Sequence, residues 1–239
     1  QYDFNSELNV EVINAGIPDA YSFTEVNFIK KNLINYDPDL FIIYDGWNDL
    51  GVNSVDYYDV TSVNPYCTSF KQTCSKILEF LTQNEYYQSF RILFKNYEVW
   101  RISSVENVKT TNYDYSENSA KNWQSAWNEI CELGKRNNFD VIVTLQPLLG
   151  TGSKQLTNEE SRKYELYNQE NKLSHYENFA NVLPELNAKC IVAKDLRNIF
   201  QNINETIFFD SGHTSDFGNE IIAKELFELS LPILKEKTQ

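Results

Sequence analysis

The chain of 239 residues has little positive charge and no long apolar stretch. It carries 21 Lys and Arg against 34 Asp and Glu, and the formal net charge of −13 disfavours a nucleic-acid partner, because phosphate backbones are themselves anionic. No apolar run approaches the length of about 18 residues that a membrane-spanning helix needs, so the sequence predicts no membrane span. No basic segment followed by an apolar core opens the chain, so no signal peptide is visible.

Cysteine is also scarce, with four residues in the chain. Cys67 and Cys74 flank a short polar segment and could close a small loop by a disulfide, whereas Cys131 and Cys190 lie in apolar segments and are expected to be buried thiols. No CxxC is present, so zinc binding and thioredoxin-like chemistry have no support. The even count, with the high Asn and Tyr content, favours a secreted protein, extracellular or at the cell surface.

Short apolar runs alternate along the chain with segments of helical periodicity. The runs predict strands at residues 10–13, 40–44, 141–145 and 190–193. Helical spacing of apolar residues recurs between them, as at residues 22–35 and 123–133. This alternation is typical of parallel strands joined by right-handed crossovers. We therefore predict one α/β domain over residues 1–239, a three-layer αβα sandwich with a mostly parallel, flavodoxin-like sheet.

Local signals predict several helix boundaries. Thr157 with Glu160 forms a capping-box pattern that starts a long polar helix reaching about residue 186, with a break near Pro184. The closing helix is predicted at residues 221–231, with Pro232 marking its end. Further helices are predicted at residues 70–81 and 87–100, and a loop or mobile cap at residues 103–118.

Residues with catalytic potential follow the predicted strands. Asp210 precedes His213 by three residues, a spacing that lets the carboxylate bind one imidazole nitrogen while the other faces a substrate. Gly16 follows the first strand, and its backbone N–H could point at a reacting oxygen. Asn48 follows the second strand, and its side-chain amide could be a further oxyanion donor.

Each of these features has an ordinary structural explanation when taken alone: a surface Asp–His pair, a turn glycine and an Asx turn. Together they favour a functional explanation, because all of them lie just beyond a strand or a strand-like segment. Loops beyond the carboxyl ends of parallel strands converge on one edge of a sheet, where ligands bind. The sequence therefore predicts a single site at that edge.

The order and spacing of these blocks resemble the SGNH (GDSL-type) hydrolases. Residues 12–16 (VINAG) are similar to the family's glycine block, residues 46–49 (GWND) match its GxND block, and residues 210–213 (DSGH) match its terminal block. The resemblance implies a metal-free ester hydrolase without a cofactor, acting on a small ester or an acetylated carbohydrate. It also implies that His213 is the base of a catalytic triad, that Asp210 orients it, and that Gly16 and Asn48 belong to the oxyanion hole.

The family's remaining block, a Gly-Asp-Ser that carries the nucleophile, has no counterpart in the sequence, and Asp19 stands where many members have a second glycine. Ser22 is better explained as a helix cap, Ser153 lies in a flexible loop, and Ser211 adjoins the orienting carboxylate. The family's sheet resembles the strand order 2-1-3-4-5, in which the serine strand separates the first two strands predicted above. We therefore expect the nucleophile strand outside this chain, for example on a separate N-terminal fragment that completes the sheet.

Two functions stay open. The first is an esterase or O-deacetylase that acts by Ser-His-Asp acyl transfer, with the serine outside the chain. The alternative is a non-catalytic module of the same fold that binds carbohydrate or has a structural role at the cell surface. The imidazole, carboxylate and amide favour the enzyme, because a structural module has no need of them. Tyrosines in the loops could stack on sugar rings: Tyr57, Tyr58, Tyr66, Tyr113 and Tyr115.

Overall fold

A parallel three-stranded sheet organises the computed structural model, which describes residues 10–17, 20–50 and 117–237, all within one compact unit. The strands are β1 (Leu40–Asp45), β2 (Asp140–Leu145) and β3 (Val192–Asp195), in the order β1-β2-β3. Leu40 is in register with Asp140, and Ile142 with Val192. The α/β class is confirmed. The predicted strands at residues 40–44 and 141–145 are correct to one residue, and the last strand begins two residues later than predicted.

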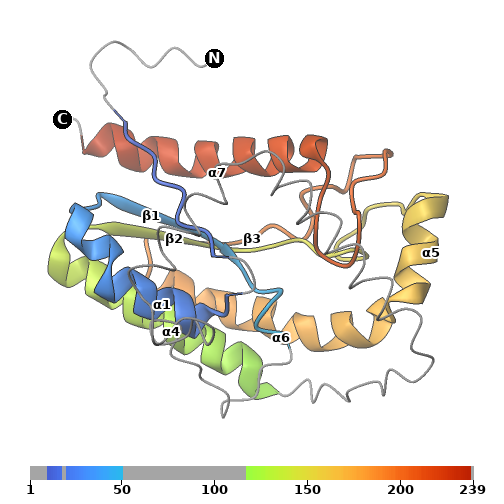
Figure 1. Cartoon of the computed structure of the whole chain (residues 1–239), viewed down its shortest axis with the longest axis horizontal. Coiled ribbons are helices and arrows are strands. Elements are labelled where there is room, and N and C mark those ends of the chain that lie inside the picture. The colour runs from blue at the N-terminus through green and yellow to red at the C-terminus, as the bar shows by residue number, and fades with distance from the viewer. Residues whose placement is uncertain (1–9, 18–19, 51–116, 238–239) are drawn as a thin grey trace, which may run out of the picture. The chain divides into compact units, whose positions relative to one another are not determined.

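Helices cover both faces of this sheet, which gives the predicted three layers (Figure 1). On one face lie α1 (Ser22–Lys31), α4 (Glu117–Asn137) and α6 (Gln169–Asn187), and on the other lies α7 (Asp216–Glu236). A short 3-10 helix (Leu33–Tyr36) follows α1. In the part of the chain described, no helix is long and apolar enough to cross a membrane.

The helices are held by packing of their apolar stripes on the sheet. In α4 the stripe recurs at spacings of three and four residues, and Trp123, Trp127 and Ile130 on it are fully buried. Tyr176 and Phe179 of α6 pack into the same core cluster. A second cluster, which includes Ile222 of α7, forms around Leu149, Phe200, Ile207 and Phe208.

Helix boundaries differ from the prediction where packing overrides local signals. The long polar segment forms two helices, α5 (Asn158–Leu166) and α6, separated at Asn168, whose left-handed conformation (φ 49°) interrupts the helix. Pro184 lies inside α6 and Pro232 inside α7, so the predicted break and the predicted end are wrong. Helical stability in proteins comes mainly from packing, and the buried Leu186 and Ile233 lie beyond the two prolines. The capping box at Thr157 and Glu160 is confirmed.

The predicted strand at residues 10–13 is wrong. Residues 10–17 form no regular structure, and Val12 and Ile13 are 86% and 52% exposed. A strand needs a neighbour for its backbone N–H and C=O groups, and within the described residues β1 pairs with β2 alone. Ile42 of β1 is also 42% exposed, so this strand is less buried than its apolar sequence suggests.

Cys131 and Cys190 form a disulfide, which corrects the prediction of two buried thiols. Both residues are buried, as expected, but the fold places their Cα atoms 4.9 Å apart although they are 59 residues apart in sequence. Several predictions fall outside the described residues: Asp19, the Cys67–Cys74 loop, the helices at 70–81 and 87–100, the loop tyrosines and nearly all of the 103–118 segment, whose last two residues begin α4.

Candidate functional site

The loop that precedes α7 is built around the carboxylate of Asp210. Its Oδ1 accepts the backbone N–H of Gly212 at 2.9 Å and of His213 at 2.8 Å, and its Oδ2 lies 2.7 Å from His213 Nδ1. An antiparallel bridge between Phe208 and Thr214 closes the base of the loop. The imidazole is thus held through Nδ1, and its side chain is 80% exposed.

These hydrogen bonds stabilise the ionised form of Asp210. Burial acts to raise the pKa of Asp210, but the backbone N–H groups of Gly212 and His213 and the imidazole outweigh it, and the pKa lies below its usual range. A carboxylate beside Nδ1 selects the tautomer with the proton on Nδ1 and stabilises the imidazolium. The lone pair then lies on Nε2, which is what a general base requires.

Glu160 holds the segment that enters this loop. Its fully buried carboxylate accepts the backbone N–H groups of Ile207 (2.8 Å) and Phe208 (3.2 Å) through Oε1. Its Oε2 accepts from Lys154 Nζ at 2.7 Å and from the Thr157 N–H at 3.0 Å. The start of α5 is thereby tied to the residues that position Asp210.

The turn after β1 depends on a glycine and on Gln146. Gly46 has a φ of 126°, and a Cβ there would lie 2.6 Å from Leu145 Cδ1 and 2.7 Å from Tyr176 Oη. The conformation and the space therefore both require glycine. The next residue, Trp47, donates its backbone N–H to Gln146 Oε1 at 3.3 Å. The Gln146 side chain, directly after β2, thus holds the turn that directly follows β1.

Asn48 lies in this turn, and the turn touches the Asp210–His213 loop. The Asn48 amide donates one hydrogen to the Ala20 carbonyl at 2.9 Å, and its second N–H is the kind of donor that an oxyanion needs. The ring of Trp47 packs against Gly212 so closely that a Cβ on Gly212 would lie 2.6 Å from Trp47 Cε3. The structure therefore brings the Asn48 turn and the His213 loop together at the carboxyl ends of the strands.

Gly16, the other predicted oxyanion donor, is not joined to this group. Its backbone N–H donates to Asn14 Oδ1 at 3.1 Å within its own exposed turn. Within the described residues, no hydrogen bond links Gly16 to Asn48 or His213. Its assignment to the oxyanion hole stays a prediction, and it requires the Asn14 bond to open.

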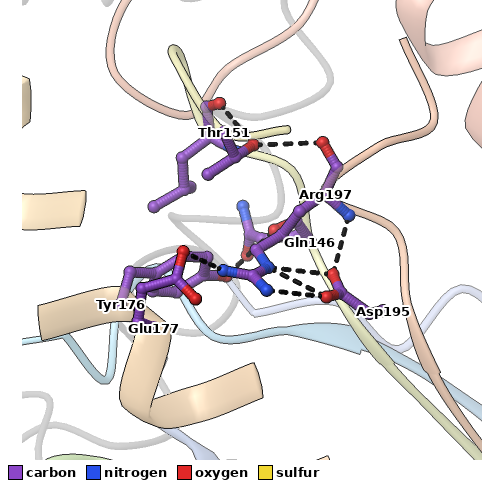
Figure 2. A network of polar contacts seen from close by, with 7 residues as sticks. Gln146, Thr151, Tyr176, Glu177, Asp195 and Arg197 are labelled. Atoms are coloured by element: carbon purple, nitrogen blue, oxygen red, sulfur yellow. Dashed lines mark hydrogen bonds and ion pairs between the residues drawn. The ribbon is translucent and has the colours of Figure 1, made fainter. Parts of the chain in front are cut away.

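A polar network ties α6 to residues at the carboxyl ends of β2 and β3 (Figure 2). Arg197 Nε and Nη2 donate to the Asp195 carboxylate at 2.9 to 3.0 Å, and Nη1 lies 2.7 Å from Glu177 Oε1. Tyr176 Oη donates to the Gln146 carbonyl at 3.0 Å. The Tyr176 hydrogen bond holds the backbone of Gln146, whose side chain in turn accepts the Trp47 N–H.

Two buried carboxyl groups, those of Asp45 and Asp49, and the half-buried Glu25 lie at the junction of α1 and β1. Asp49 accepts both the N–H (3.0 Å) and the Oγ–H (2.5 Å) of Ser22, and Asp45 accepts from Trp123 Nε1 at 2.9 Å. Burial raises the pKa of both aspartates, and repulsion from Asp45 adds to the effect at Asp49. Burial, then repulsion from both aspartates, raises the pKa of Glu25 to about 9.

This junction corrects the interpretation of Ser22 as a helix cap. The N-cap of α1 is Tyr21, which makes no side-chain cap, and the Asp49 carboxylate binds the first helical N–H instead. A negative group at this position is favoured by the helix dipole.

Among the residues described, no group of three or more His, Cys, Asp or Glu side chains is arranged to hold a metal.

Lys172 is a residue near the site that sequence reasoning missed. It lies in the first turn of α6, and its Nζ donates to Ser211 Oγ at 3.2 Å. The same ammonium lies over the rings of Trp47 and Tyr167, at 5.5 and 5.8 Å from their centroids. Burial lowers the pKa of Lys172, and the nearby Asp210 charge opposes this only in part. No local signal marks this lysine, because its partners come from three separate segments.

The described residues thus define an α/β protein with an Asp–His pair at the carboxyl edge of a parallel sheet. No family model matches the sequence, and no curated protein matches it. Among solved structures, the crystal structure of an acetyl xylan esterase aligns with 92% of this chain and 80% of its own, with 13% sequence identity and a TM-score of 0.48.

Proposed function

We propose that this protein is a carboxylic ester hydrolase, an SGNH-type esterase or O-deacetylase, in which His213 is the general base. The observation that carries the proposal is the imidazole itself, which is bound to Asp210 through Nδ1 at 2.7 Å while its side chain is 80% exposed. The Asn48 turn beside it supplies a side-chain amide. These groups correspond to the base, the orienting carboxylate and an oxyanion donor of acyl transfer.

In the proposed reaction, Nε2 of His213 accepts the proton of a serine hydroxyl as its oxygen attacks the ester carbonyl. Asp210 stabilises the imidazolium, and the Asn48 amide donates to the oxyanion, with the Gly16 N–H as a further donor. Collapse of the intermediate expels the alcohol, which takes the proton from His213. Water then attacks the acyl-serine in the same way, which releases the acid and restores the serine.

We place the nucleophilic serine outside the described residues. Ser22 is buried against Asp49, and Ser211 is 4% exposed and bound to Lys172. A strand that carries the serine would also pair with the outer edge of β1. A separate N-terminal fragment could supply this strand. The proposed substrate is a small ester or an acetylated carbohydrate. The Cys131–Cys190 disulfide supports an extracellular or cell-surface location, because disulfides persist in oxidising compartments.

Hydrolysis of p-nitrophenyl acetate by the protein with its native N-terminus tests this function. His213→Ala should reduce kcat by at least about 10³-fold, as loss of a triad base does, whereas His175→Ala, which changes the other histidine, should not. Labelling with a fluorophosphonate, followed by peptide mass spectrometry, should identify the serine. Turnover that His213→Ala leaves intact would exclude the proposal, and absence of turnover in the intact protein would favour the carbohydrate-binding or structural module.

A further inference from the structure

Lys172 brings a positive charge to the proposed site, and no carboxylate of the described residues forms an ion pair with it. Its Nζ donates to the Ser211 hydroxyl at 3.2 Å and faces the rings of Trp47 and Tyr167. None of the ion pairs between described residues includes Lys172. The hydrogen bond and the two ring contacts of Lys172 are thus with uncharged groups, and the nearby Asp210 carboxylate acts on it only through space.

Such an arrangement favours an anionic ligand. An ammonium has three N–H donors, and the Ser211 hydroxyl takes one of them. Burial penalises the charge, and the aromatic faces compensate for it less well than an anion does. The peptide dipoles at the N-terminus of α6 add positive potential, which Glu170 in the same turn offsets in part. A carboxylate placed here would form charge-assisted hydrogen bonds, which are about twice as strong as neutral ones.

The position of this charge relates it to the proposed chemistry. Ser211 precedes His213 by two residues, so their Cα atoms lie at most about 7.6 Å apart. The ring of Trp47 packs against Gly212, the residue between them. The charge of Asp210, which binds His213 Nδ1, also acts on Lys172, so a group bound at Lys172 lies next to the loop that carries the proposed base.

We propose that Lys172, Trp47 and Tyr167 form a subsite, next to the loop that carries His213, that binds a carboxylate of the ester substrate. The inference rests on the proposed function and narrows its substrate class to esters that carry a negative charge. The ammonium binds the carboxylate, and the two rings orient the ammonium and cover the neighbouring apolar part of the substrate. Lys172 is then a specificity-determining residue.

Matched pairs of substrates test the subsite in the protein with its native N-terminus. p-Nitrophenyl hemisuccinate against p-nitrophenyl butyrate places the carboxylate on the acyl side, and acetylated glucuronic acid against acetylated glucose places it on the alcohol side. In at least one pair, Lys172→Met should lower the charged-to-neutral ratio of kcat/KM by about tenfold, the usual worth of one charged hydrogen bond. Lys172→Arg should restore part of this ratio.

Lys224→Met is the charge-matched control, because Lys224 is exposed on α7 and pairs only loosely with Glu228, at 4.0 Å. It should leave both ratios unchanged. A ratio that falls equally in the Lys224 and Lys172 variants reports net charge alone and overturns the subsite. Unchanged ratios in Lys172→Met, with turnover that still depends on His213, overturn the subsite but not the esterase.

A binding measurement separates this inference from catalysis. Calorimetric titration of the His213→Ala protein with monomethyl succinate and with neutral methyl butyrate compares the ligands without turnover. Monomethyl succinate should bind about tenfold more tightly than methyl butyrate, and Lys172→Met should abolish the difference. Lys172-dependent binding in a protein that hydrolyses no ester would support the subsite and reject the esterase, and equal binding of both ligands overturns the subsite.

Discussion

At the scale of single residues, Asp210 joins loop structure to electrostatics. Its Oδ1 shapes the loop by accepting two backbone N–H groups, and its Oδ2 faces His213 Nδ1. In Asp210→Asn the loop keeps an acceptor, but an amide N–H₂ faces Nδ1 and selects the wrong imidazole tautomer. We expect kcat on p-nitrophenyl acetate to fall by about 10⁴-fold, as in acyl-transfer triads, with little change in the free energy of unfolding.

Asp37→Asn is the matched control for this change. Asp37 is exposed and has a left-handed backbone (φ 51°), which asparagine also adopts readily. Its kcat should equal that of the wild type. Equal turnover in the two variants would contradict an electrostatic role for Asp210.

Glu160 offers a residue-scale prediction about stability. Its carboxylate is fully buried and accepts from Lys154, Thr157, Ile207 and Phe208. Glu160→Ala leaves four donors without their acceptor, one of them a buried ammonium, and should lower the free energy of unfolding by on the order of 3–5 kcal/mol. Urea denaturation measures this loss. Glu159→Ala, which removes an exposed partner of Lys163, should cost below about 1 kcal/mol.

The pH dependence of this contribution has a defined sign. Burial acts to raise the pKa of Glu160, but the bonds from Lys154 and from the backbone outweigh it and lower the pKa. The folded state therefore holds the carboxylate ionised more strongly than the unfolded chain does. Its contribution is present above the unfolded pKa of about 4.3 and is lost as the pH falls through the folded pKa.

At the scale of elements, the α1–β1 junction should make stability fall with rising pH. The pKa of Glu25 is raised to about 9, mainly by burial and then by Asp45 and Asp49. A carboxyl group protonated in the folded state and ionised in the unfolded chain costs stability between its two pKa values, by up to about 1.4 kcal/mol per pH unit. Glu25→Gln should therefore flatten the fall in unfolding free energy between pH 5 and pH 9.

Denaturant titrations at several pH values check this slope. Glu25→Gln should match the wild type at pH 5 and exceed it in stability at pH 9. Glu220→Gln, an exposed change on α7, should leave the slope of the wild type. A Glu25→Gln slope equal to that of the wild type would mean that Glu25 is ionised in the folded protein.

The elements that sequence patterns predicted well are those whose cause is local. The apolar runs of β1 and β2, the periodic stripe of α4 and the capping box at Thr157 and Glu160 depend on neighbouring residues. The errors arise where tertiary structure decides. Pro184 remains in α6 because packing continues past it, and residues 10–13 have strand propensity but no strand neighbour within the described residues.

The candidate site likewise contains local contacts, which the sequence predicted, and long-range contacts, which it did not. The Asp210–His213 bond joins residues three apart, so the spacing predicted it. Lys172 and Ser211 are 39 residues apart, and Trp47 meets Gly212 across a still larger separation. Contacts of this kind follow from the crossing of helices and loops at the sheet edge, which no local pattern encodes.

At the scale of the whole molecule, the Cys131–Cys190 disulfide links α4 to the segment after α6 across 59 residues. Closing a loop of that length removes entropy from the unfolded chain that corresponds to about 4 kcal/mol. The double variant Cys131→Ala/Cys190→Ala should therefore unfold at a clearly lower urea concentration. Dithiothreitol should shift the wild type in the same direction and by more than it shifts the double variant, whose own shift measures the effect of the reductant on the rest of the protein.

Hydrogen exchange can show where this stabilisation acts. If the disulfide works by restricting the unfolded chain, its loss lowers the free energy of global unfolding, and the slowest amides of every element exchange through that state. We therefore expect reduction to speed the slowest amides of α7 by the same factor as those of α4 and α6, although the bridge does not touch α7. An increase confined to α4 and α6 would contradict this and place the effect in native packing.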